Sequence, residues 1–294
     1  RMAARLERKP HLARDLGDGV LLRVRRHLAE GDDQIAAFGL LQAVVTVGLV
    51  ACSMMLCLAT RDFDLSVGST VAFTGMMAVM VTNATGSIPM GILGAIVAGA
   101  AVGMINGVII AKIGINALIT TLATMQLVRG FGLIISDGRA VGINEPAFYN
   151  ISLSNILGIP TPILVLVLAF VIFGVLLNRT VFGRNTLAIG GNPDAARLAG
   201  VKVAWTRVAI FTIQGVMCAV AGVLLASRIT SGQPNAATGL ELTVISACVL
   251  GGVSLGGGRA TMTGVIVGVL ILGIAENVMN LLNIQAFYQY VVRG

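Results

Sequence analysis

A short run of charged and hydroxyl residues separates two long apolar stretches in the first quarter of the chain. It contains Arg61, Asp62, Asp64 and Ser66. Ionisable groups beside membrane-depth segments are costly and often mark a pathway or a specific partner. Asp62 and Asp64 could accept hydrogen bonds from a hydroxylated solute. Alternatively, they could pair with Arg61 or cap the following helix, because Asp64 and Ser66 are favourable N-cap types. Both interpretations stay open at the level of sequence.

A second group of polar residues lies inside the apolar stretch 115–135. Asn116, Thr120 and Thr124 are spaced four residues apart, which places them on one helix face, and Gln126 follows them. Neutral hydrogen-bonding groups suit a path for an uncharged polar solute, although hydrogen bonding between helices explains them equally well. Stretch 260–282 carries a similar polar face. The candidate path therefore comprises Asp62, Asp64, Ser66, Asn116, Thr120, Thr124, Gln126, Glu276 and Asn277.

The segment 178–207, called the basic loop below, carries five Lys/Arg residues and one acidic residue, Asp194. Asn192 can cap a helix that begins at Pro193. Asp194 would then lie at the positive end of the helix dipole, and Gly200 would end the segment. We expect a short amphipathic helix over 193–199. Such a helix either docks a partner protein or serves as a mere connector.

Composition places these groups in a membrane protein. The chain has 294 residues, of which 56% are hydrophobic and 11% charged, and its mean hydropathy is +0.92. A soluble domain carries about 25% charged residues. All four cysteines lie in apolar stretches and read as small buried hydrophobes. Both histidines lie in the first 34 residues, so we predict no metal site.

Apolar stretches along the chain predict an all-α, polytopic transmembrane bundle. Full crossing takes about 20 apolar residues, so 65–82 and 243–255 are short and we expect broken or re-entrant helices there. Span 88–111 carries small residues four apart at Gly91, Ala95, Gly99, Gly103 and Gly107, a pattern typical of close helix packing. The candidate spans number about eight: 35–60, 65–82, 88–111, 115–135, 161–178, 208–226, 243–255 and 260–282.

The net charge of +7 does not indicate nucleic-acid binding, because the basic residues are concentrated in the first 34 residues and in the basic loop. Basic excess in a short loop between apolar spans marks the cytoplasmic side. The sequence contains no G-x-x-x-x-G-K-[ST], H-E-x-x-H or G-x-S-x-G motif. We therefore expect no catalysis and no cofactor on this chain.

Several segments resemble the membrane permeases of bacterial ABC importers for ribose, xylose, galactose and arabinose. They are 62–69 (DFDLSVGS), 182–192 (FGRNTLAIGGN), 195–200 (AARLAG) and 231–234 (SGQP). Segments 115–126 (INALITTLATMQ) and 245–254 (ISACVLGGVS) are similar to the L-arabinose permeases in particular. The resemblance covers 39–294.

This resemblance implies a multi-pass protein of the bacterial inner membrane that moves a monosaccharide. It implies two copies of an ATP-binding subunit, which would hold ATP and Mg²⁺, a periplasmic sugar-binding protein and a second permease copy. It also implies that the basic loop is cytoplasmic and couples the permease to the ATPase. The residues expected in that role are Phe182, Gly183, Arg184, Asn192, Asp194, Ala195, Ala196 and Gly200.

Residues 1–38 do not resemble the first span of the family, whose members have about ten spans. Five candidate spans precede the basic loop, which would place it outside if the N-terminus were cytoplasmic. One further span ahead of position 39 would restore the expected side. We therefore expect a chain that is truncated or frame-disrupted at its start and truncated at its end.

Two other classes of protein are weighed against the importer. A secondary transporter driven by an ion gradient would need deep acidic residues and inverted repeats. Asp62, Asp64 and Glu276 fit the first requirement, but no repeat is visible. A membrane-embedded enzyme would need a nucleophile and base, and no such arrangement is found.

Overall fold

The computed structural model describes residues 33–156, 158–282 and 284, and the side chains from Val44 onward. Residues 44–272 form one compact unit, and the described residues on either side of it belong to a second. Every element discussed below lies in the 44–272 unit except where stated. Most of the atypical N-terminal segment predicted at 1–38 lies outside the described residues, and the predicted division into domains stays a prediction.

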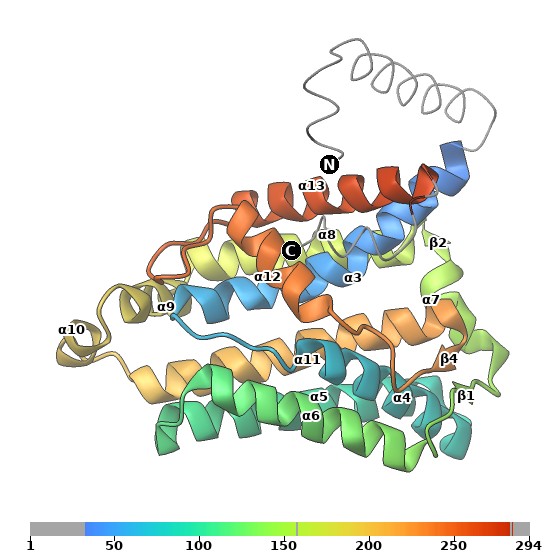
Figure 1. Ribbon diagram of the computed structural model, residues 1–294, viewed down its shortest axis with the longest axis horizontal. Coiled ribbons are helices and arrows are strands. Elements are labelled where there is room, and N and C mark those ends of the chain that lie inside the picture. The colour runs from blue at the N-terminus through green and yellow to red at the C-terminus, as the bar shows by residue number, and fades with distance from the viewer. Residues whose placement is uncertain (1–32, 157, 283, 285–294) are drawn as a thin grey trace, which may run out of the picture. The chain divides into compact units, whose positions relative to one another are not determined.

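The described part of the chain is mostly helical (Figure 1). A π-helical turn at Ile109–Ile113 extends α5, and a 3₁₀ turn lies at Pro146–Tyr149. The α-helices are α3 (Asp33–Ala59), α4 (Val67–Thr85), α5 (Ile88–Val108), α6 (Ala117–Ile135), α7 (Asn150–Leu153), α8 (Thr161–Arg179), α9 (Val181–Gly191), α10 (Pro193–Leu198), α11 (Val203–Ile229), α12 (Leu240–Leu250) and α13 (Met262–Leu281).

Six of the described helices are long and apolar enough to span a membrane, which confirms a polytopic helical bundle. They are α4, α5 with its π-helical extension, α6, α8, α11 and α13. The expectation of a broken or re-entrant helix was wrong at 65–82, because α4 is one continuous helix of 19 residues that is long enough to span a membrane. At 243–255, α12 has 11 residues, too few for a full crossing, and a broken or re-entrant helix there stays a prediction.

Close packing of α5 on α4 and α11 forms the centre of the bundle. All five residues of the small-residue stripe in α5 are buried, as predicted. Gly99 and Gly215 lie so close that a Cβ on either would overlap the backbone of the other. Packing between small residues replaces water exclusion as the force that joins helices in a membrane.

Segments 136–160 and 230–239 meet at one end of the 44–272 unit. Strand β1 (Val141–Gly142) pairs antiparallel with β4 (Ser231–Gly232), and β2 (Asn155–Ile156) pairs with β3 (Ile159–Pro160). Phe148 is fully buried, in a cluster with Ala78, Ala95 and Val223. Segment 136–160 thus lies mostly at the surface and is anchored in the core by Ile143 and Phe148. We call this end of the unit the opposite end, because it lies opposite the basic end that carries α9 and α10 (Figure 1).

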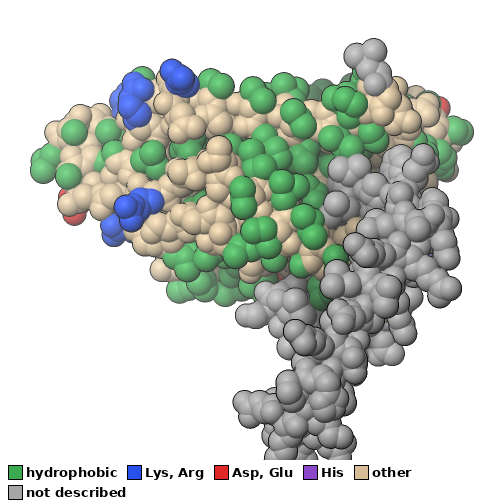
Figure 2. All heavy atoms as spheres, turned by 90° about the horizontal axis from the view of Figure 1, so that it is seen from above, with side chains coloured by type: hydrophobic (Ala, Val, Ile, Leu, Met, Phe, Trp, Pro, Cys, Tyr) green, Lys and Arg blue, Asp and Glu red, His purple; other side chains and the backbone are tan. Residues whose placement is uncertain are grey.

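The basic end of the unit is the one that carries α9 and α10 (Figure 1). Lys and Arg side chains gather there, whereas hydrophobic side chains cover much of the surface along the helices (Figure 2). An apolar belt with a basic end is the arrangement expected of a membrane span with its cytoplasmic side. The basic loop was expected to contain one helix, but it also contains α9, which lies directly before α10.

Candidate functional site

The linker 60–66 between α3 and α4 begins with a tight helix C-terminus. The amide of Arg61 donates to the carbonyl of Leu58, and the amide of Asp62 donates to that of Cys57, both at 3.0 Å. These are the two bonds of a Schellman motif, whose left-handed position is usually glycine. Here Arg61 occupies it at φ 65°. A non-glycine residue in this conformation costs about 1 kcal/mol, which a side-chain interaction can offset.

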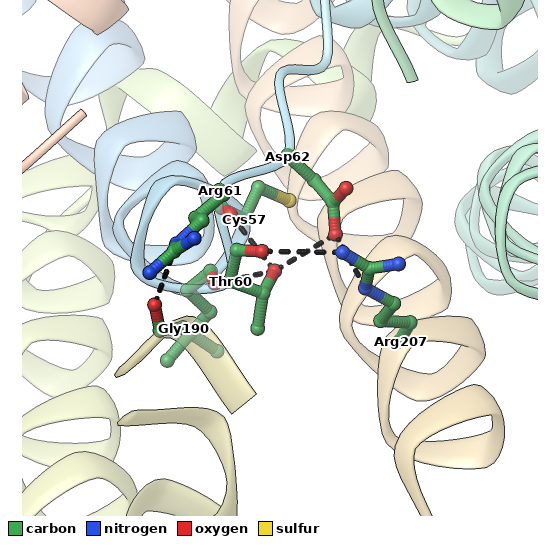
Figure 3. A network of polar contacts seen from close by, with 7 residues as sticks. Cys57, Thr60, Arg61, Asp62, Gly190 and Arg207 are labelled. Atoms are coloured by element: carbon green, nitrogen blue, oxygen red, sulfur yellow. Dashed lines mark hydrogen bonds and ion pairs between the residues drawn. The ribbon is translucent and has the colours of Figure 1, made fainter. Parts of the chain in front are cut away.

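The Arg61 side chain supplies that interaction by reaching α9. Its Nε donates to the carbonyl of Gly190 at 2.7 Å (Figure 3). A terminal nitrogen donates to the carbonyl of Gly191 at 2.8 Å. These carbonyls lie in the last turn of α9, where helix carbonyls lack partners and carry partial negative charge. The amide of Gly258 donates to the carbonyl of Ala59 at 2.9 Å, so the loop after α12 joins the same contact.

Asp62 points the other way, toward α11 (Figure 3). Its carboxylate lies 3.0 Å from Nε of Arg207 and accepts a hydrogen bond from the Thr60 hydroxyl at 3.0 Å. Burial raises the pKa of Asp62, whereas the Arg207 guanidinium and the Thr60 hydroxyl act to lower it. We call Arg61, Asp62 and their partners Gly190, Gly191 and Arg207 the Arg61–Asp62 junction.

The second half of the linker starts a chain of buried hydrogen bonds that crosses three elements. Asp64 accepts from the amide and hydroxyl of Ser66. The amide nitrogen of Asn106 on α5 donates to the Ser66 hydroxyl at 3.1 Å. The Thr124 hydroxyl on α6 donates to the side-chain oxygen Oδ1 of Asn106 at 2.6 Å. We call these four residues the polar chain. Ser66 directly precedes α4, but its side chain makes no capping bond.

The structure treats the other predicted path residues differently from one another. Asn116 caps α6 by accepting from the amide of Leu118, and Thr120 donates to the Asn116 carbonyl. Both therefore serve local structure at the start of α6. Gln126 lies exposed on α6. Glu276 and Asn277 lie on the part of α13 that belongs to the second unit, so they have no assigned place beside the others.

The predicted helix of the basic loop is present as α10. Asn192 accepts from the amides of Asp194 and Ala195, both at 3.0 Å, and Gly200 has φ 86°, as the capping residues indicated. Ala196 is buried against Ile189 and Val203. Its side chain therefore packs within the chain and is not available to a partner. Leu198 faces away and is 91% exposed.

An open groove of about 510 Å³ lies between α9 and the start of α11. Phe182 and Gly200, two of the residues expected to couple, line it together with Trp205. Gly183 is buried so closely that a Cβ there would overlap the carbonyls of Leu176 and Leu177. Arg184, Asp194 and Ala195 are exposed. The basic end thus presents a small helix beside a groove.

Three residues important to this arrangement were not singled out in the sequence. Asn106 is a lone amide within the small-residue stretch of α5, and Arg207 is the last cation of the basic loop. Arg129 lies within α6, and one of its terminal nitrogens donates to the carbonyls of Pro234 and Ala236 at 2.6 and 2.9 Å. An arginine inside an apolar span is itself a signal, and it would have identified Arg129.

In the part of the chain that the structure describes, no group of His, Cys, Asp or Glu could hold a metal ion. The basic end presents α10 beside a groove, and the polar chain places hydrogen-bonding groups inside the bundle. With six helices long and apolar enough to cross a membrane, these features belong to a multi-pass membrane protein.

Comparison with known proteins places the chain more narrowly. It belongs to the family described as "Branched-chain amino acid transport system / permease component", whose model matches residues 36–294. It is 56% identical to the L-arabinose transport system permease protein AraH of Escherichia coli (strain K12), over 87% of this chain and 78% of that protein.

Two further relatives agree with this placement. The L-arabinose ABC transporter permease protein AraH of Azospirillum brasilense is 52% identical over 87% of this chain and 76% of its own length. The ribose import permease protein RbsC of Bacillus subtilis (strain 168) is 44% identical over 87% and 80%. No solved structure matches the chain.

Proposed function

We propose that this chain is the membrane permease of an ATP-driven importer that carries L-arabinose, or a related monosaccharide, across a bacterial inner membrane. ATP hydrolysis would take place on two copies of a separate ATP-binding subunit, and a periplasmic protein would deliver the sugar. The names of the relatives support the substrate class. The observation that carries the proposal is α10, a capped helix that projects from the basic end.

The geometry of α10 suits a docking role. Its inner face is fixed by Ala196, whereas Leu198 presents a large apolar side chain to solvent, 91% exposed. An exposed apolar side chain of this kind can fill a pocket on a partner protein, and the neighbouring Trp205 is of a residue type enriched at binding hot spots. The groove lined by Phe182 and Trp205 gives such a partner a second point of contact.

One exposed face of α6 suits contact with a second permease copy. Gln126 lies in the middle of α6 and is exposed, as are its neighbours Leu122 and Leu127. An amide that faces lipid loses its hydrogen bonds at a cost of several kcal/mol, on the order of 4. A second copy on this face would cover Gln126 or enclose it in a watery path. The polar chain ends on the same helix, at Thr124, so α6 is the best candidate to line the sugar path.

The docking proposal is tested by binding of the ATP-binding subunit to the detergent-solubilised chain. We expect Leu198→Asp to weaken binding by about tenfold or more, because it places a charge at the centre of an apolar contact. Leu153→Asp is the matched control: Leu153 is also exposed, at 65%, but lies on α7 at the opposite end. Equal binding by both variants would remove α10 from the interface.

Substrate choice is tested separately, by uptake of L-arabinose and ribose into proteoliposomes that hold the complete transporter. We expect ATP-dependent uptake with L-arabinose preferred. Uptake that follows an imposed ion gradient without ATP would instead identify a secondary transporter. ATP-dependent uptake of ribose alone would retain the importer and correct the sugar.

A further inference from the structure

We propose that Arg61 is the positioning residue that transmits movement of the basic loop to the helices around the sugar path. The inference rests on the proposed function, since it assumes an ATP-binding subunit that moves α10. Arg61 contacts neither ATP nor sugar in this scheme. It acts by fixing the end of α9 to the linker 60–66.

The first step of the argument is the place of the Arg61 contacts. Its guanidinium binds the carbonyls of Gly190 and Gly191, and the next residue, Asn192, caps α10. A displacement of α10 that moves the end of α9 therefore reaches the point that Arg61 holds. A Cβ on Gly190 would overlap the Ala59 carbonyl oxygen, so the end of α9 also touches the end of α3 directly.

The second step is the backbone conformation of Arg61. The residue occupies a left-handed position at which glycine is the usual choice. A glycine there would close the same Schellman motif with less strain. The arginine is thus unfavourable for the local backbone, and what it adds is the link to α9.

The third step is what the linker touches beyond Arg61. Asp62 joins α11 through Arg207, which keeps the linker close to the first turns of that helix. Ser66 joins α5 through Asn106, and Asn106 joins α6 through Thr124. A displacement of the linker therefore reaches both helices that carry the polar chain. Contiguity alone does not demonstrate coupling, so a functional test must separate transmission from stability.

The test uses the complete transporter in proteoliposomes, with ATP hydrolysis and sugar uptake measured on the same preparation. The variant is Arg61→Gly, which removes the guanidinium and relieves the left-handed backbone. We expect the ATP-binding subunits to remain bound and to hydrolyse ATP. Uptake per ATP hydrolysed should fall by about fivefold or more, the range of typical coupling between sites. The Lys side chain in Arg61→Lys can reach one of the two carbonyls, so its uptake per ATP should lie between that of the wild type and that of Arg61→Gly.

Arg139→Gly is the matched control, because Arg139 is an exposed loop arginine beyond the end of α6, at the opposite end. It should keep the wild-type ratio. If Arg61→Gly fails to fold, Thr124→Val tests the far end of the same route and should also lower the ratio. An unchanged ratio in Arg61→Gly would overturn the inference, as would loss of subunit binding, which would assign Arg61 to the docking surface. A wild-type chain that neither binds the subunits nor takes up sugar would instead refute the proposed function.

Discussion

The two ends of the 44–272 unit are held together in different ways. At the opposite end, backbone pairing joins β1 to β4, and Phe148 packs into the core. Hydrogen bonds from Ser227 to the Phe148 carbonyl and from Asn83 to the Gly142 carbonyl add to these contacts. At the basic end, α9 and α10 are joined to the linker chiefly through the Arg61–Asp62 junction.

This difference separates stability from transmission. At the opposite end, many small contacts together hold the loops in place, so no single side chain controls their position. At the basic end, the Arg61 guanidinium and the Asp62–Arg207 ion pair join the linker to α9 and α11, beside the backbone contact at Gly190. Each of these two polar contacts can be removed by one substitution. We therefore expect lesions at the opposite end to lower stability alone, and lesions at the junction to alter coupling as well.

The largest effect should come from closing the approach between α9 and α3. In Gly190→Ala, the new Cβ would overlap both the Ala59 carbonyl oxygen and the Gly258 amide nitrogen, which are backbone atoms that cannot rotate away. We expect a destabilisation of about 3 kcal/mol, measured by thermal unfolding in detergent. Gly191→Ala is the matched control, because nothing lies within 4 Å of its Cβ position. Equal melting of both variants would show that the contact yields easily.

A smaller effect is expected at the opposite end from Arg129→Gln. The variant loses two hydrogen bonds from a charged donor to the carbonyls of Pro234 and Ala236. Bonds to charged groups contribute about 2 kcal/mol, so unfolding in detergent should occur at a lower temperature. Arg139→Gln, at an exposed site, should melt as the wild type does. The comparison also requires that uptake per ATP stay unchanged in Arg129→Gln, and a lowered ratio would contradict it.

Hydrophobic pattern predicted most of the fold because membrane helices must satisfy their own backbone groups. Each apolar stretch could only be a helix, and the small-residue stripe of α5 identified its packing face. The pattern missed α9, whose Gly-rich and polar sequence resembles a loop. That helix is held by the side chain of Thr180, which accepts from the Gly183 amide, and by packing of Gly183 and Gly190 on neighbouring backbone.

The site was predicted less completely, for a physical reason. Asn192 and Gly200 act within a few residues, so that sequence spacing alone indicated α10. Arg61 and Gly190, or Ser66 and Asn106, are partners far apart in the chain, and nothing in either local sequence names the other. Asp62 was expected to pair with Arg61 as one alternative, but it pairs with Arg207. Tertiary contact alone distinguished these choices.

The smallest effect is expected from the other ion pair of the basic end. Arg197 and Asp194 lie 3.4 Å apart on α10, with side chains 70% and 83% exposed. Water screens such a pair, and ordering two side chains offsets much of the attraction, so Arg197→Gln should change the stability of the isolated chain by about 0.5 kcal/mol or less. Unfolding is measured in detergent without the ATP-binding subunit, which separates the contribution of the ion pair to stability from any role in docking. A shift as large as that of Gly190→Ala would mean that α10 is held by its surface charges, and the contrast between its buried face at Ala196 and its exposed face at Leu198 would lose its meaning.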